Sequence, residues 1–248
     1  MAVMAKAPRR GRVKTRLVPP LSETEAAALS GAFLRDITAN IQDAARTAPI
    51  TGYLAYAPAG TTSQFDGLIA AGTRLVLADG SDAAVPGVAG IGRSLLHATR
   101  TLLADGAGGV CLVNADSPTL PTAFLAEAAD ALARPGDRLV LGPAEDGGYY
   151  LIGLKSAYAD IFTDISWSTA TVAAETLARA RARALDVVTL PYWYDVDDAV
   201  SLARLQRDLA GATGAAAGSP EPFAAPATIA CLARFGSGCS NTHATAPS

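Results

Sequence analysis

Hydrophobic positions along the chain fall into short unbroken runs that alternate with longer amphipathic stretches. The run at residues 109–113 is apolar throughout, which is typical of a strand buried on both faces of a sheet. The stretch after Ser22 is long and Ala-rich. Its first residues, Ser22-Glu23-Thr24-Glu25, match a capping box, so the pattern predicts a helix from there to about residue 46.

The rest of the chain continues this alternation. Further strands are predicted at residues 2–5, 50–56, 74–77, 139–141, 149–154 and 187–190. Further helices are predicted at residues 63–71, 94–105, 121–134, 171–184 and 198–209. Strands that alternate with helices of this length are typical of an α/β domain with a mainly parallel sheet.

The pattern changes after residue 210, where Gly, Ala, Ser, Pro and Thr dominate and Pro220, Pro222 and Pro226 interrupt any period. We therefore expect one domain at residues 1–210 and a low-complexity, largely disordered tail at residues 211–248. Only the apolar stretch 229–232 is a candidate for packing on the domain. A chain cut near Gly211 is expected to fold and to bind ligand as the full chain does.

Composition narrows the class of protein. Of 248 residues, 50% are hydrophobic and 17% are charged, which fits a globular chain with a sizeable core. Three cysteines and two histidines, with neither C-x-x-C nor H-E-x-x-H, argue against the common zinc sites and a disulfide framework. The net charge of -3 and the lack of a long apolar run predict a cytoplasmic protein without nucleic-acid or membrane partners.

Positive charge is concentrated near the amino terminus, in a loop that we call the basic loop. It holds six of the twenty basic residues before the first acid, Glu23: Lys6, Arg9, Arg10, Arg12, Lys14 and Arg16. Pro8 and Gly11 indicate that this segment is a loop following the first strand. Lysines and arginines at the end of a strand suit the phosphates of a nucleotide, although a solvated basic surface is the alternative.

Acidic residues follow two other predicted strands. Asp116 comes directly after the most apolar run, where an unpaired carboxylate is costly unless it faces a crevice. A carboxylate beside phosphates is typical of a magnesium site, and a helix cap is the alternative. Asp197 follows the last strand and is the candidate second ligand. Asp197 or Asp198 could instead cap the final helix, and Asp195 or Asp198 could replace Asp197 as the ligand.

Two further segments carry candidate substrate-binding residues. Asp146, Gly147 and Gly148 form a turn whose carboxylate could accept hydrogen bonds from hydroxyl groups, beyond the role of a plain hairpin. Trp167 and Ser168 place an indole beside hydroxyl groups, and a core tryptophan with a serine cap is the alternative. In contrast, Gly90-Ile91-Gly92 does not complete a dinucleotide fingerprint, because Leu95 stands at the third glycine position.

In this order, these segments resemble the bacterial DUF2064 family of nucleotide-diphospho-sugar transferase-like proteins, distant relatives of phospholactate guanylyltransferase. The resemblance extends over residues 2–209, and its strongest marks are residues 6–17, 116–120, 141–154, 167–169 and 195–197. The chain departs from the family pattern at Gly90 and Ser94, where an acid and an arginine are usual.

The resemblance implies a three-layer, Rossmann-like GT-A fold with a mainly parallel mixed sheet. It also implies a nucleotide at the amino-terminal half and Mg²⁺ or Mn²⁺ at Asp116. The expected function is a metal-dependent transferase, by nucleotidyl transfer from an NTP or glycosyl transfer from an NDP-sugar to a small acceptor. The alternative is a non-catalytic nucleotide-binding regulatory or scaffold protein.

Each candidate residue has an expected role in that reaction. Lys14 and Asp116 are the expected catalytic residues, and Asp116 and Asp197 the expected metal ligands. The nucleotide's phosphates are expected at Lys6, Pro8, Gly11, Lys14 and Arg16. The other substrate is expected at Asp146, Gly147, Gly148, Trp167 and Ser168.

Overall fold

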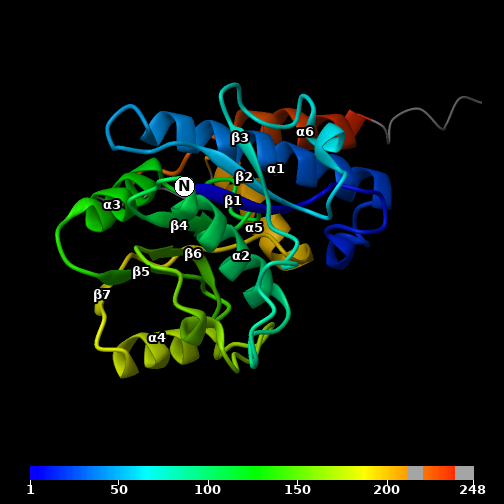
Figure 1. Ribbon diagram of the computed structural model, residues 1–248. Helices are drawn as coiled ribbons and strands as arrows, with labels where there is room; N and C mark the ends of the chain where they lie inside the picture. The colour runs from blue at the N-terminus through cyan, green and yellow to red at the C-terminus, as the bar shows by residue number, and fades with distance from the viewer. Residues whose placement is uncertain (212–219, 238–248) are drawn as a thin grey trace, which may run out of the picture.

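The computed structural model describes residues 1–211 and 220–237 and shows one sheet with helices on both faces (Figure 1). The sheet has seven strands in the order β3-β2-β1-β4-β6-β5-β7. The strands are β1 (Ala2–Lys6), β2 (Tyr53–Ala57), β3 (Arg74–Leu77), β4 (Val110–Val113), β5 (Arg138–Pro143), β6 (Tyr149–Leu154) and β7 (Asp186–Thr189).

The helices follow the predicted alternation closely. They are α1 (Glu23–Ala44), α2 (Ile91–Ala104), α3 (Thr122–Ala133), α4 (Val172–Ala182), α5 (Ala199–Leu209) and α6 (Pro226–Ser237). The capping box at Ser22 is present, with the Ser22 and Glu25 side chains each bonded to the other's backbone N–H. The helix predicted at 63–71 is wrong. Only the 3-10 turn Thr62–Phe65 forms. The backbone leaves the helical region at Asp66, which has a ψ of 126°, and the positive φ of Gly67 prevents an α-helix from continuing.

The mainly parallel sheet predicted from the sequence is confirmed. β1 pairs in parallel with both β2 and β4, and β2 pairs in parallel with β3. Only β6 runs antiparallel to its neighbours β4 and β5, while β5 and β7 are parallel. The β5–β6 hairpin therefore turns at the same edge of the sheet at which the parallel strands end.

Two hydrophobic clusters, one on each face of the sheet, make the three layers. Side chains of α1 and α3, such as Ile37 and Phe124, pack with Val113 of β4 on one face. Side chains of α2, such as Leu96, pack with Leu112 of β4 on the other. All four residues of β4 are buried, as predicted for the most apolar run.

The prediction of a disordered tail is wrong for part of its length. Residues 226–237 form α6, which lies alongside α1 (Figure 1). Cys231, Leu232 and Phe235 of α6 pack against a third hydrophobic cluster, which includes Phe33 of α1 and Leu202 of α5. The repeated prolines and small residues give no helical period from which this helix could be predicted. The apolar stretch 229–232, predicted as the candidate for packing on the domain, lies within α6. Residues 212–219 and 238–248 lie outside the described residues.

Among the residues that the structure describes, no helix has both the length and the hydropathy needed to span a membrane.

Candidate active site

The carboxyl ends of β1 and β4 lie side by side at one edge of the sheet. Along the chain, β2 and β3 are added to the sheet on one side of β1, whereas β4 is added on its other side. The direction in which strands are added therefore reverses between β1 and β4. Open α/β sheets bind ligands at such a reversal. Two cavities open there, the basic cavity (about 350 Å³) and the acidic cavity (about 360 Å³), and they share Arg16, Asp116 and Asp197 among their lining residues.

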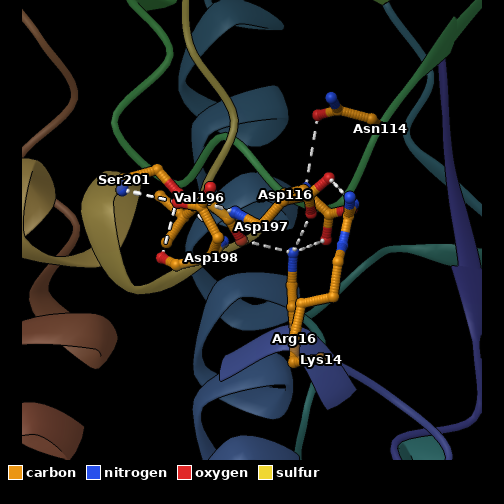
Figure 2. A network of polar contacts seen from close by, with 8 residues as sticks. All are labelled: Lys14, Arg16, Asn114, Asp116, Val196, Asp197, Asp198 and Ser201. Atoms are coloured by element: carbon orange, nitrogen blue, oxygen red, sulfur yellow. Dashed lines mark hydrogen bonds and ion pairs between the residues drawn. The ribbon is translucent and has the colours of Figure 1, made fainter. Parts of the chain in front are cut away.

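Lys14 lies at the centre of a network of polar contacts at this edge of the sheet (Figure 2). Its side chain is only 6% exposed, and its backbone has a left-handed φ of 49°. The Nζ atom lies 2.6 Å from Asp116 Oδ1 and 3.1 Å from Asp197 Oδ1, and it donates to Val196 O at 2.7 Å. All three donors of the ammonium group are therefore used. Three segments that are distant in sequence meet at this one nitrogen.

The other basic residues divide into two groups. Lys6, Arg12 and Arg16 line the basic cavity with Lys14, and Arg16 also donates to Asp197 Oδ2 at 2.7 Å. Arg9 and Arg10 bond instead to Gln64 and Glu23, away from the cavity. The structure thus brings together three of the five residues predicted to bind phosphates.

Pro8 and Gly11 are the two phosphate-binding candidates that do not line either cavity. Gly11 has a φ of 69°, a conformation that glycine adopts without strain, so it shapes the path of the basic loop. Their contribution is to the loop's course, not to contact within the cavities.

Asp116 does not cap a helix. Helix α3 starts at Thr122, after Pro121, and no side chain caps it. The turn at Asp116 is instead made by Asn114, whose Oδ1 accepts the Asp116 N–H at 3.2 Å. The Asp116 side chain is 37% exposed and faces Lys14. The cap interpretation of Asp116 is therefore wrong, and its carboxylate remains available to a ligand.

The ambiguity between Asp197 and Asp198 is also resolved. Asp198 caps α5, with its carboxylate accepting the Ser201 N–H and the Ser201 side chain bonding back. Asp197 takes no part in the cap through its side chain, which bonds to Lys14 and Arg16. Of the two, Asp197 therefore faces the site.

Asp195 is the residue whose importance the sequence reasoning underestimated. It lines the acidic cavity with Asp116, Asp146 and Asp197. Burial, together with the charges of Asp146, Asp197 and Asp116, raises the pKa of Asp195 to about 7. The available signal was the alternation after β7, which places Asp195 and Asp197 on the same side of an extended chain.

Four of the five predicted substrate-binding residues, Asp146, Gly148, Trp167 and Ser168, line the acidic cavity. Gly147 does not. It has a φ of 90°, and a Cβ added there would lie 2.1 Å from the Ala170 carbonyl oxygen. Gly147 thus lets the turn pack closely on residue 170, while the Gly148 N–H donates to Asp146 Oδ1 at 2.8 Å.

A larger cavity, of about 540 Å³, lies at the opposite edge of the sheet. Met1, Tyr53 and Arg74 are among its lining residues, so it opens at the amino ends of β1, β2 and β3. Ligands of open α/β sheets bind at the other edge, where the polar side chains of the present chain converge. Size alone therefore does not locate the site.

Comparison with known proteins agrees with this architecture. A family model described as "Uncharacterized protein conserved in bacteria (DUF2064)" matches residues 40–169. No curated protein matches the chain significantly. A solved structure from Desulfovibrio desulfuricans, provisionally named a nucleotide-diphospho-sugar transferase, is 27% identical with a TM-score of 0.76. The match covers 95% of this chain and 94% of that chain.

Two other solved structures are more remote. Rv0371c from Mycobacterium tuberculosis is 20% identical with a TM-score of 0.45, covering 82% of this chain and 95% of that one. A CMP:2-keto-3-deoxy-manno-octonic acid synthetase complexed with CTP is 10% identical with a TM-score of 0.49, covering 86% and 98%. The nucleotide-diphospho-sugar transferase fold expected from the sequence is confirmed by the Desulfovibrio structure.

Proposed function

The chain belongs to the DUF2064 family, and from that premise we propose that it is a divalent-metal-dependent transferase acting on a nucleotide. The observation that carries this proposal is the meeting of the basic loop, Asp116 and Asp197 at the Lys14 ammonium. Cations for phosphates and carboxylates for a metal lie within one ion-pair network, as nucleotide chemistry requires. The 27% identity to the Desulfovibrio protein along nearly the whole chain supports the same class of reaction.

The residues present fit Mg²⁺ or Mn²⁺. Asp116 and Asp197 already direct one oxygen each at a single cationic nitrogen, so both carboxylates face the same point. Hard oxygen donors suit these ions, and Mg²⁺ commonly takes one or two carboxylates with phosphate oxygens and waters. Among the described residues, no cluster of three or more acids, histidines or cysteines is arranged to hold a metal. We therefore propose that the metal binds together with the nucleotide.

Each residue then has a defined task. Lys6, Lys14 and Arg16 bind the phosphates and offset the negative charge that grows on them during transfer. Asp116 and Asp197 are the side chains that would hold the metal, which supplies further charge neutralisation when bound. Asp146, Gly148, Trp167 and Ser168 bind the part of the substrates that lies in the acidic cavity.

Two reactions fit this arrangement. In nucleotidyl transfer, a phosphorylated acceptor attacks the α-phosphate of an NTP, and the bond to pyrophosphate breaks. In glycosyl transfer, an acceptor attacks the anomeric carbon of an NDP-sugar, and the bond to the diphosphate breaks. In both reactions the departing group is a diphosphate that the basic loop can hold. We propose a small-molecule acceptor in either case.

A product assay tests the proposal. The protein is incubated with Mg²⁺ or Mn²⁺ and panels of NTPs, NDP-sugars and small acceptors, and pyrophosphate and NDP are quantified. Pyrophosphate release that depends on a phosphorylated acceptor identifies nucleotidyl transfer, and NDP release identifies glycosyl transfer. Asp116→Asn should abolish either product. Asp105→Asn, beside the cavity at the opposite edge, should not. Nucleotide binding with neither product favours the scaffold alternative and overturns the transferase proposal.

A further inference from the structure

Gly90 and Gly92 have a structural purpose that a dinucleotide fingerprint does not explain. The indole of Trp167 lies against both glycines at the start of α2. A Cβ on Gly92 would lie 2.8 Å from Trp167 Cζ2, and a Cβ on Gly90 would lie 3.4 Å from Trp167 Cδ1. Gly90 also has a φ of 54°. The two glycines therefore leave the space that the Trp167 ring occupies, at the segment where the chain departs from the family pattern.

Trp167 also lines the acidic cavity, together with groups that differ from those of the basic cavity. Near it in sequence are the exposed Ser168 and Thr169, and the wall includes the carboxylates of Asp146 and Asp195. Among the lining residues of this cavity, Arg16 is the only lysine, arginine or histidine, and it is paired with Asp197. The lining thus combines an aromatic ring, hydroxyl groups and carboxylates.

We propose that the Trp167 side of the acidic cavity binds an uncharged polyhydroxyl group of hexose size, and not a phosphorylated group. The inference rests on the proposed function, because it assigns the part of the substrates that lies beyond the diphosphate. The apolar C–H face of a sugar packs on an indole, and its hydroxyls donate to carboxylates and exchange hydrogen bonds with Ser168 and Thr169. A phosphate placed there would meet the carboxylates of Asp146 and Asp195, and Arg16, the one basic residue of the lining, is already assigned to the diphosphate.

The hexose can come from two sources, the sugar of an NDP-sugar donor or a sugar acceptor. Two single-tryptophan variants make the cavity observable, because the chain has only two tryptophans. Trp193→Phe leaves Trp167 as the only indole. Trp167→Phe leaves Trp193, which packs against Phe124 and Tyr194 and does not line the acidic cavity. Thermal unfolding establishes that each variant is folded.

Fluorescence and calorimetric titrations use UDP, ADP and GDP against UDP-glucose, ADP-glucose and GDP-mannose, with Mg²⁺ present. Further titrations add glucose or mannose to the NDP complex, and glucose 1-phosphate to the complex with an NTP. We expect a sugar-dependent signal in Trp193→Phe and none in Trp167→Phe. We also expect the hexose to increase affinity about tenfold, and Trp167→Ala or Gly92→Ala to remove that gain.

A gain in the NDP-sugar titrations identifies the donor's sugar, and a gain with free hexose identifies an acceptor. Nucleotide binding without any gain from a hexose overturns the inference and leaves the proposed function intact. The inference is also overturned if the hexose-dependent gain in affinity persists in Trp167→Ala. The same holds if glucose 1-phosphate binds more tightly than glucose and this preference depends on Trp167. If no nucleotide binds, the proposed function fails instead, and titration of Trp193→Phe with free hexose decides the inference alone.

Discussion

At the scale of the residue, Lys14 competes with the proposed metal ion for the carboxylates of Asp116 and Asp197. Its ammonium lies between Asp116 and Asp197, and its stem passes Phe33, whose ring centroid is 5.5 Å from Nζ. A cation already occupies the point at which both acids are directed. Metal binding therefore requires this ammonium to leave or to share the acids, and the freed ammonium is then available to the phosphates.

Replacing Lys14 is expected to have opposite effects on the two ligands. Lys14→Met should raise the affinity for Mn²⁺ alone, because it removes the competing cation. It should weaken nucleotide binding by about 1–3 kcal/mol, the range for a hydrogen bond to a charged group. Calorimetry with each ligand measures both. Lys6→Met is the control and should weaken only nucleotide binding, because Lys6 lines the basic cavity but does not belong to the ion pairs of Lys14 with Asp116 and Asp197. Weaker Mn²⁺ binding in Lys14→Met would contradict this account.

Neighbouring aspartates should respond differently to the same substitution. Asp116→Asn and Asp197→Asn should abolish the metal-dependent part of nucleotide affinity, because each removes a charged oxygen from the shared point. Asp198→Asn should change neither affinity nor stability by much, because Asn caps a helix about as well as Asp. Nucleotide titrations with and without Mg²⁺ measure the difference. If both Asp116→Asn and Asp197→Asn retained Mg²⁺-dependent affinity, the metal assignment would fail.

Asp195 makes the stability of the metal-free protein depend on pH. Its pKa is raised from 3.8 to about 7, so between these values the folded state retains a proton that the unfolded state has released. Stability therefore falls as pH rises through this range, by at most about 1.4 kcal/mol per pH unit. Asp195→Asn removes that loss. Relative to the natural chain, the free energy of unfolding of Asp195→Asn should therefore rise by about 3 kcal/mol between about pH 4.5 and about pH 8.

Urea unfolding in the presence of a chelator measures this pH dependence. Asp146→Asn is the companion variant, because Asp146 is the first of the charges that raise the pKa of Asp195. It should remove part of the slope and leave the cavity's shape unchanged. Identical pH slopes in the natural chain and Asp195→Asn would show that Asp195 is ionised throughout.

At the scale of the elements, α6 is tied to the domain by a buried carboxylate of α1. Asp36 is 1% exposed, and its two oxygens accept the N–H groups of Ala227 at 2.9 Å and Thr228 at 2.7 Å. An aspartate of one helix thus caps the amino terminus of another. Phe33 of α1 belongs to the hydrophobic cluster that α6 packs against, and its ring lies beside the Lys14 ammonium. Phe33 therefore connects α6 with the basic loop.

Removal of α6 is therefore expected to destabilise the protein, contrary to the sequence-based expectation. A chain ending at Gly211 exposes the apolar surface that Cys231, Leu232 and Phe235 cover and leaves Asp36 without its partners. The loss should be about 3 kcal/mol or more, at roughly 1 kcal/mol for each partly buried side chain. Denaturant unfolding measures it.

Asp36→Ala in the full chain separates the two contributions to that loss. It retains the apolar contacts of α6 but leaves two N–H groups unsatisfied, at a cost of about 1–3 kcal/mol. It should therefore unfold at a denaturant concentration between those of the natural chain and the shortened one. Equal stability of the natural and shortened chains would show that residues 220–237 are dispensable for the stability of the domain.

At the scale of the whole molecule, strand order decides which chemistry is possible. The central pair β1–β4 brings the basic loop beside Asp116, and β7 returns Asp197 to the same edge from the far end of the sheet. Charge is divided accordingly, with cations around the basic cavity and carboxylates around the acidic one. A substrate that extends across both is expected to be anionic at one end and rich in hydroxyls at the other.

The sequence by itself determined the seven strands, most of the helices and the residue types of the site. Strand and helix periods are local, and so are the capping box at Ser22, the buried run of β4 and the position of acids after strands. Physical interactions between near neighbours set these features, which is why a single sequence predicts them. The family resemblance added the fold, because five short motifs in a fixed order identify it.

Only the tertiary structure decided which of those residues meet. Lys14 donates to a carbonyl oxygen 182 positions away, and Asp36 caps a helix 191 positions away. No local pattern encodes such pairs, so Asp197 could not be separated from Asp198, nor α6 from a loose tail. These outcomes depend on burial: a carboxylate removed from water must find a donor or a cation, and the packed sheet determines which one is within reach.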